Sequence, residues 1–219
     1  MNILYGARLA RWDLLNIVQL LASRVNKWSD GCDRALHRLM CYIHHTSDRV
    51  LRGYVGGKAD SVSLRLYADA DFAGDRPKFK STSGVLLALI DDNTCFPLCA
   101  KSAKHTCVAH STVEAEMVAA NTAVRTVGIP SLGVWESALK RHAVLNLIED
   151  NESTYQIIKI RKNPTMRHLT RTHGSASTCL CCTTCGKGRS SGSPTPALKL
   201  NVQTSSLRRS ATLPHGKEP

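Results

Sequence analysis

Long apolar runs are missing from this 219-residue sequence, and acidic residues are scarce. No run approaches the roughly 20 apolar residues that cross a bilayer, so we expect no membrane association. Asp and Glu number 17 against 29 Lys and Arg, which gives a net charge of +12 at pH 7. Because Lys and Arg release counterions when they neutralise phosphates, this charge favours a polyanion as the partner, although solubility alone would also explain it.

The cysteines do not form the even, regularly spaced set that a disulfide framework needs. There are nine, unevenly spread, and we identify no signal peptide. A reducing intracellular compartment, the cytoplasm or the nucleus, is therefore favoured over secretion. Arginines within residues 1–28 could imitate a mitochondrial presequence, but we expect a folded amphipathic helix there. The sequence does not indicate an oligomeric state.

Two packed helices are predicted in the first 58 residues. Apolar side chains recur at helical spacing in two runs, which are Leu14, Leu15, Val18, Leu21 and Val25, then Ala35, Leu36, Leu39, Met40 and Ile43. A turn sequence at residues 29–31 separates the runs, and the helical pattern ends at three glycines, Gly53, Gly56 and Gly57.

Three strands with short connections are predicted next. Residues 63–69 alternate between apolar and polar side chains, which predicts a strand that ends in an acid. After a charged turn at residues 74–83, further strands are expected at residues 85–90 and 95–100. Short connections of this kind join antiparallel neighbours, so we expect a meander.

A helix, a strand and a second helix follow the meander. Ser111 and Glu114 form a capping box, which starts a helix that Gly128 and Pro130 then break or kink. A short apolar strand and another helix are expected after it, at residues 143–148 and 153–159. The sequence therefore predicts an α/β fold with flanking helices.

Residues 174–219 change in composition to Ser, Thr, Gly, Pro and Cys, and we expect this tail to be disordered. One cluster in it could ligate zinc together with His173, namely Cys179, Cys181, Cys182 and Cys185. Its spacing lacks two separated ligand pairs that would wrap a tetrahedral ion. A tail without zinc is therefore the favoured interpretation.

Asp69, Glu116 and Asp150 are the candidate site residues. Each lies at the end of a predicted strand or in the first turns of a predicted helix. Acids at the ends of neighbouring parallel strands and on a facing helix would meet at one edge of the sheet. Carboxylates in such a nest can hold two Mg²⁺ ions for phosphodiester hydrolysis, whereas each acid taken singly would be explained as a solvated side chain.

Four ordered motifs resemble the ribonuclease H domain of copia-type long-terminal-repeat retrotransposon Pol polyproteins. They are YADADFAGD at residues 67–75, KSTSG at 80–84, STVEAEM at 111–117 and EDNES at 149–153. Residues 1–58 look like the connecting segment that follows the reverse transcriptase palm in those polyproteins. The resemblance divides the chain into this segment, a ribonuclease H-like domain at 59–173 and the tail at 174–219.

The resemblance implies a mixed sheet of three antiparallel strands followed by a parallel strand, with Asp69, Glu116 and Asp150 as ligands for Mg²⁺ or Mn²⁺. It implies an endonuclease that hydrolyses the RNA strand of an RNA/DNA hybrid. The turn formed by Lys80, Ser81, Thr82 and Ser83 would touch the phosphates of the hybrid, with a simple capped turn as the alternative. The polymerase motif has no counterpart here, so we expect no DNA synthesis, and the rest of a Pol polyprotein is an additional partner.

The resemblance stops at His173. Family members continue to a fifth strand and a short helix with an Ala-Asp step, whose Asp completes the metal site, and residues 174–219 contain nothing similar. We therefore expect an incomplete domain with an exposed sheet edge, a weakened second metal position and a shifted or foreign C-terminus. Two functions stay open: a hybrid-cutting nuclease, and a catalytically inactive nucleic-acid-binding remnant of a retrotransposon polyprotein.

Overall fold

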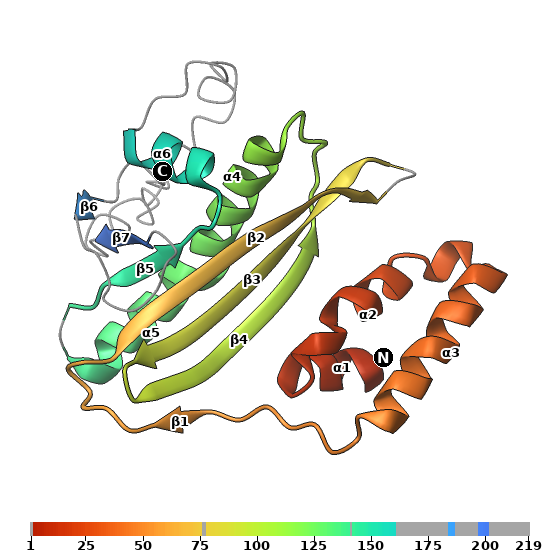
Figure 1. Ribbon diagram of the computed structural model, residues 1–219, viewed down its shortest axis with the longest axis horizontal. Coiled ribbons are helices and arrows are strands. Elements are labelled where there is room, and N and C mark those ends of the chain that lie inside the picture. The colour runs from red at the N-terminus through yellow and green to blue at the C-terminus, as the bar shows by residue number, and fades with distance from the viewer. Residues whose placement is uncertain (1, 76–77, 141, 161–183, 187–196, 202–219) are drawn as a thin grey trace, which may run out of the picture.

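The computed structural model describes residues 2–75, 78–140, 142–160, 184–186 and 197–201, which form a mixed sheet with flanking helices (Figure 1). The strand order in the sheet is β1-β4-β3-β2-β5-β7-β6. Strands β2, β3 and β4 pair antiparallel, and β5 pairs parallel to β2. The expected mixed α/β architecture is therefore confirmed. Among the described helices, none combines the length and apolar character that a bilayer crossing requires.

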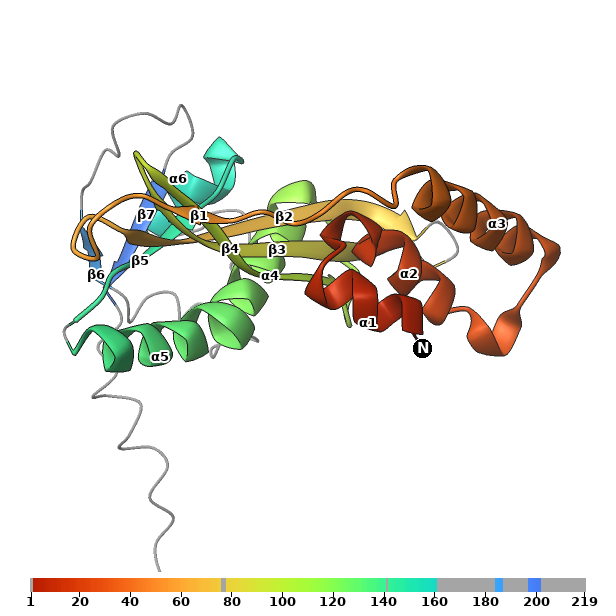
Figure 2. The same ribbon diagram turned by 90° about the horizontal axis from the view of Figure 1, so that it is seen from below.

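The N-terminal helices pack together beside the sheet (Figure 2). The structure contains three α-helices where the sequence predicted two: α1 (Asn2–Leu9), α2 (Leu15–Ala22) and α3 (Asp30–His45). Single turns of 3₁₀-helix at Trp12–Leu14 and Val25–Lys27 separate them. Their buried side chains form a core of their own, against which Ala100 of the sheet packs.

The meander consists of two long hairpins. Its strands are β2 (Ser63–Asp75), β3 (Lys80–Asp91) and β4 (Thr94–Lys104), with the short β1 (Tyr54–Val55) paired outside β4. Pairing between β2 and β3 continues past Asp69 to an irregularity between Asp71 and Asp75. The segment predicted as a charged turn at 74–83 is therefore largely strand, and Ala73 adopts a positive φ of 53° at the irregularity.

Helix α4 (Thr112–Ala123) covers one face of β2 and β3 and begins as predicted. The Ser111 hydroxyl accepts a hydrogen bond from the Glu114 amide at 3.1 Å, and the Glu114 carboxylate accepts one from the His110 amide at 2.7 Å. A π-helical turn at Val124–Gly128 then joins α4 to α5 (Ile129–Leu139), so the predicted kink takes the form of a π-bulge.

Gly128 in this bulge is required by close packing. A Cβ atom there would lie 2.7 Å from Leu145 Cδ2 and 3.0 Å from Leu66 Cδ2, and both leucines are fully buried. The absence of a side chain therefore lets the helix approach the sheet at the level of β5 (Leu145–Ile148). Helix α6 (Glu152–Ile160) follows, with the Asn151 side chain accepting a hydrogen bond from the Thr154 amide at 3.1 Å.

The edge that we expected beside β5 is covered, which corrects the prediction of an exposed sheet edge. Strand β7 (Ala197–Asn201) pairs antiparallel with β5, and β6 (Thr184–Gly186) pairs with β7. Backbone N–H and C=O groups at a sheet edge can pair with any extended segment, whatever its sequence. Two segments of the predicted disordered tail are thus strands. Cys185 lies in β6, whereas His173, Cys179, Cys181 and Cys182 lie outside the described residues, as does any zinc site that they form.

Replacing Leu66 by alanine should destabilise the domain far more than the same change at Leu86. Leu66 is fully buried in the core between the sheet and α4, while Leu86 is 36% exposed on the opposite face. We expect Leu66→Ala to lower the free energy of unfolding by about 2–5 kcal/mol, and Leu86→Ala by less than about 1 kcal/mol. Urea unfolding followed by circular dichroism measures both, and equal losses would contradict this core assignment.

Candidate metal centre

Asp69 and Asp150 come together because the parallel pairing of β2 with β5 stops just before both of them, although β2 itself continues to Asp75. The ladder between β2 and β5 runs from Leu64↔Leu145 to Tyr67↔Ile148. Asp69 and Asp150 each lie two residues beyond that last pair, on neighbouring strands that run in the same direction. Both carboxylates are exposed to solvent.

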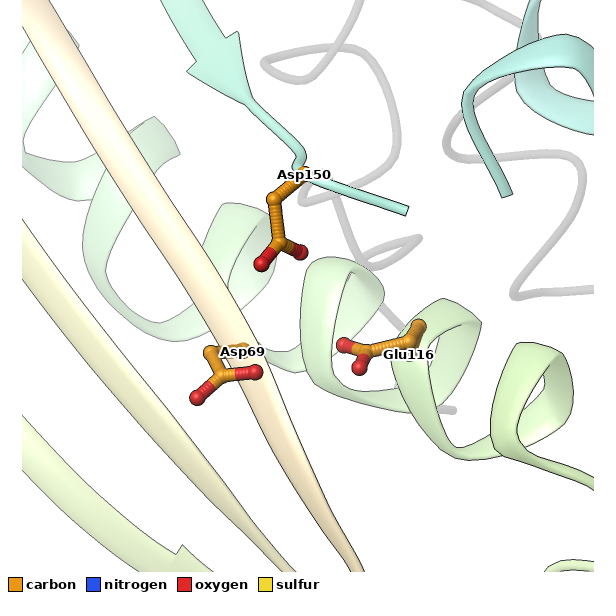
Figure 3. Close-up of side chains that lie close together, drawn as sticks. All are labelled: Asp69, Glu116 and Asp150. Carbon is orange, nitrogen blue, oxygen red and sulfur yellow. The ribbon is translucent and has the colours of Figure 1, made fainter. Parts of the chain in front are cut away.

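Glu116 reaches the same point from the second turn of α4, the helix that packs across β2 and β3. Its side chain is only 8% exposed. One carboxylate oxygen from each of Asp69, Glu116 and Asp150 lies within 4.8 Å of the other two, and the three side chains converge in Figure 3. The structure therefore brings together the three acids that the sequence singled out.

The site carries concentrated negative charge. Burial, followed by the charges of Asp69 and Asp150, raises the pKa of Glu116 to about 7. The Glu116 Oε2 atom is buried and has no hydrogen-bond partner among the described residues. Within the part of the chain that the structure describes, no ion pair joins a Lys or Arg to any of the three acids. A cation bound here would satisfy both the charge and the unpaired oxygen.

Glu149 is a fourth acid beside the site, and the sequence analysis did not select it. It lies between the end of β5 and Asp150, and its side chain is completely buried. Burial, and next the charge of Glu116, raise the pKa of Glu149 to about 8. The amide of Asn151 opposes this shift, but within the described part of the chain no group reaches hydrogen-bonding geometry with either Glu149 oxygen. The only signal in the sequence was the adjacent pair of acids in the EDNES motif.

The four residues predicted to contact nucleic acid, Lys80 to Ser83, lie in β3, where successive side chains point to opposite faces of the sheet. Ser81 and Ser83 are buried, with the Ser81 hydroxyl accepting a hydrogen bond from the Ala73 amide at 3.2 Å and Ser83 Oγ lying 2.6 Å from His105 Nε2. Ser81 thus links β3 to β2, and Ser83 contacts His105 just beyond β4. Both hydroxyls are buried and not available to phosphates, which corrects the prediction. Lys80 and Thr82 are half-buried on the other face, and Lys80 Nζ donates to the Thr106 carbonyl at 2.8 Å.

A groove of about 340 Å³ lies over the face of the sheet that carries Asp69. The sheet side of its lining includes Asp69, Asp71, Thr82 and Lys101, and the N-terminal segment contributes the other side through residues that include Trp12 and Asn16. Sequence reasoning did not anticipate that the N-terminal helices form one side of a groove beside the acids.

The donor set fits a hard divalent cation. Mg²⁺ and Ca²⁺ prefer carboxylate oxygens, and Mg²⁺ commonly uses one or two carboxylates and completes its shell with water. Clusters of exposed acids also occur without an ion, so the unpaired Glu116 oxygen is the stronger indication. Comparison with models of known protein families finds no match for the chain, and comparison with solved structures finds none either.

Proposed function

We propose that the chain is a ribonuclease H-like domain, derived from a retrotransposon Pol polyprotein, that binds RNA/DNA hybrids and hydrolyses the RNA strand. The observation that carries this proposal is the convergence of Asp69, Glu116 and Asp150 within 4.8 Å, just beyond the parallel pairing of β2 with β5. The antiparallel order of β2, β3 and β4, followed by the parallel β5, agrees with the fold that the motif resemblance implies.

Asp69, Glu116 and Asp150 would hold Mg²⁺ or Mn²⁺ in this site. When bound, two such ions activate the attacking water and stabilise the leaving 3′ oxygen of the cleaved phosphodiester. Glu116 is fixed by its helix and by burial, whereas Asp69 and Asp150 face solvent, where the substrate approaches. The protein therefore supplies a rigid inner acid and two outer acids that lie beside the substrate.

The groove beside Asp69 gives the nucleic acid a place to lie. Thr82 lines it and would donate a hydrogen bond to a phosphate oxygen of the hybrid. The excess of 29 basic over 17 acidic residues attracts the polyanion to the protein. Residues 1–58, as the connecting segment of the polyprotein, would form one side of this groove.

A catalytically inactive nucleic-acid-binding remnant is the second candidate. It is favoured by the composition of residues 174–219, which contain Glu218 as their one acidic residue and lack the Ala-Asp step of the family. In that case the chain, with its net charge of +12, would still bind hybrids in a salt-dependent manner, but the RNA strand would stay intact.

Incubation of the purified chain with a hybrid that carries end-labelled RNA tests the proposal. We expect internal cuts in the RNA strand in the presence of Mg²⁺ or Mn²⁺, and none in EDTA, in single-stranded RNA or in duplex DNA. Binding that weakens steeply with salt but is not followed by cleavage would favour the inactive remnant. The absence of both binding and cleavage would overturn both functions.

A further inference from the structure

We infer that Glu149 is a fourth carboxylate ligand of the metal centre and that, together with Glu116, it forms a second divalent-cation position. This inference rests on the proposed function, because it assigns a further ligand to the same two-metal site. Under this inference Glu149 takes the place of the acid that the tail lacks. It directly precedes Asp150, one of the trio of acids formed by Asp69, Glu116 and Asp150.

The first observation is that Glu149 is a buried carboxyl group without a partner. Its side chain has no exposed surface, and neither Oε1 nor Oε2 finds a hydrogen bond among the described residues. Buried polar groups are nearly always hydrogen-bonded, and buried charges are paired or coordinate metals. A completely buried acid with two free oxygens therefore indicates that a binding partner is absent.

The second observation is the charge that surrounds it. Glu149 directly precedes Asp150 in the chain, and an Asp150 oxygen lies within 4.8 Å of oxygens of Glu116 and Asp69. No ion pair with a Lys or Arg relieves these four acids within the described residues. A sequence that concentrates four carboxyl groups beside the ends of two strands is explained by cations that bind between them.

The position of Glu149 favours a separate cation over a shared one. The close group of mutually adjacent oxygens comprises Asp69, Glu116 and Asp150 and does not include Glu149. Both oxygens of Glu149 and the Oε2 atom of Glu116 are buried without a hydrogen-bond partner among the described residues. A carboxylate with two oxygens can bridge two ions, so Glu116 would lie between the trio's ion and the ion held by Glu149.

Titration of the full, metal-free chain with Mn²⁺ alone, followed by electron paramagnetic resonance, counts the positions directly. We expect two bound ions in the wild type. Glu149→Gln, which keeps size but removes charge, should retain one ion and weaken the second at least about 10-fold. Glu152→Gln is the matched control, because Glu152 lies three residues further on, is exposed, and accepts a hydrogen bond from the Gln156 side chain at 2.7 Å.

Misfolding is separated from ligand loss by a second variant and a second measurement. Glu149→Asp keeps the charge and should keep the second ion with reduced affinity, and the circular dichroism of each metal-free variant should match that of the wild type. Two ions bound to Glu149→Gln at wild-type affinity would overturn the inference, as would a wild type that binds one ion or none.

The same titration separates failure of this inference from failure of the proposed function. If the wild type binds two Mn²⁺ ions, loses one in Glu149→Gln and never cuts a hybrid, the second cation position stands and the nuclease function falls. If hybrid cleavage is robust and Glu149→Gln leaves both binding and cleavage unchanged, the nuclease function stands and Glu149 is only a buried acid.

Discussion

Asp69→Asn should reduce Mg²⁺-dependent cleavage of the RNA in an RNA/DNA hybrid by at least about 100-fold, equivalent to about 2.7 kcal/mol of transition-state stabilisation. The amide has almost the same shape as the carboxylate but carries no charge, so it binds a hard cation poorly. Asp69 lies between the solvent-exposed groove and the buried Glu116, and its oxygen is within 4.8 Å of the other two acids. Single-turnover cleavage of labelled hybrid under saturating protein measures the loss.

Asp71→Asn provides the matched control. Asp71 is two residues further along the same strand, is exposed, and lines the same groove, but it is not a member of the close group of acids. The Asp71→Asn substitution removes one negative charge from the same surface as Asp69→Asn does, so we expect hybrid cleavage to change by less than about 3-fold. Equal losses in the two variants would show that the groove's overall charge matters and that Asp69 has no special role.

Sequence patterns that span a few residues correctly predicted the start of α4 and the strand β2. The capping box of Ser111 and Glu114 is a pattern within four residues, and the Ser111 hydroxyl accepts the expected bond from the Glu114 amide. The Glu114 carboxylate accepts its bond from the amide of His110, one residue before the cap. Alternation in β2 likewise depends only on neighbouring residues. The pairing of β5 with β7 joins segments about 50 residues apart, and no local pattern encodes which extended segment will reach an open edge.

The difference between short-range patterns and contacts made only in the folded chain also explains which site residues the sequence could predict. Asp69 and Asp150 were found because acids at the ends of parallel strands meet, whatever the details of side-chain orientation. Glu149 immediately precedes Asp150, and two adjacent residues after a strand point in different directions, so sequence alone could not show which of them is buried. Ser81 and Ser83 were misjudged because β3 begins at Lys80, earlier than predicted, and its alternation turns both hydroxyls inward.

Metal-free protein should lose stability as the pH rises from about 5 to about 8. The pKa values of Glu116 and Glu149 are raised from 4.5 to about 7 and about 8 in the folded chain. Below pH 4.5 both carboxyls are protonated in the folded and unfolded chains, so their burial costs no charge. Above pH 4.5 the unfolded chain loses both protons, whereas the folded chain keeps them until the pH approaches the raised pKa values. Ionisation therefore stabilises the unfolded chain more than the folded chain, and the free energy of unfolding falls as the pH rises.

At about 1.4 kcal/mol for each pKa unit, the rise of the Glu116 pKa from 4.5 to about 7 alone corresponds to roughly 3 kcal/mol. Because the two acids interact, we expect a combined loss in the free energy of unfolding that is at least this large but smaller than the sum of the two separate losses. His105 acts in the opposite direction, because burial lowers its pKa below the ordinary value of 6.5, so its contribution favours folding as the pH rises toward 6.5 and is constant above that value. Urea unfolding in EDTA at pH 5, 6, 7 and 8 should therefore compare wild type with Glu149→Gln, which retains His105. The difference between them should shrink when Mg²⁺ is added at pH 8, because a cation that binds only the folded chain stabilises it. A wild type whose stability follows that of the variant at every pH would contradict the buried, charged environment of Glu149.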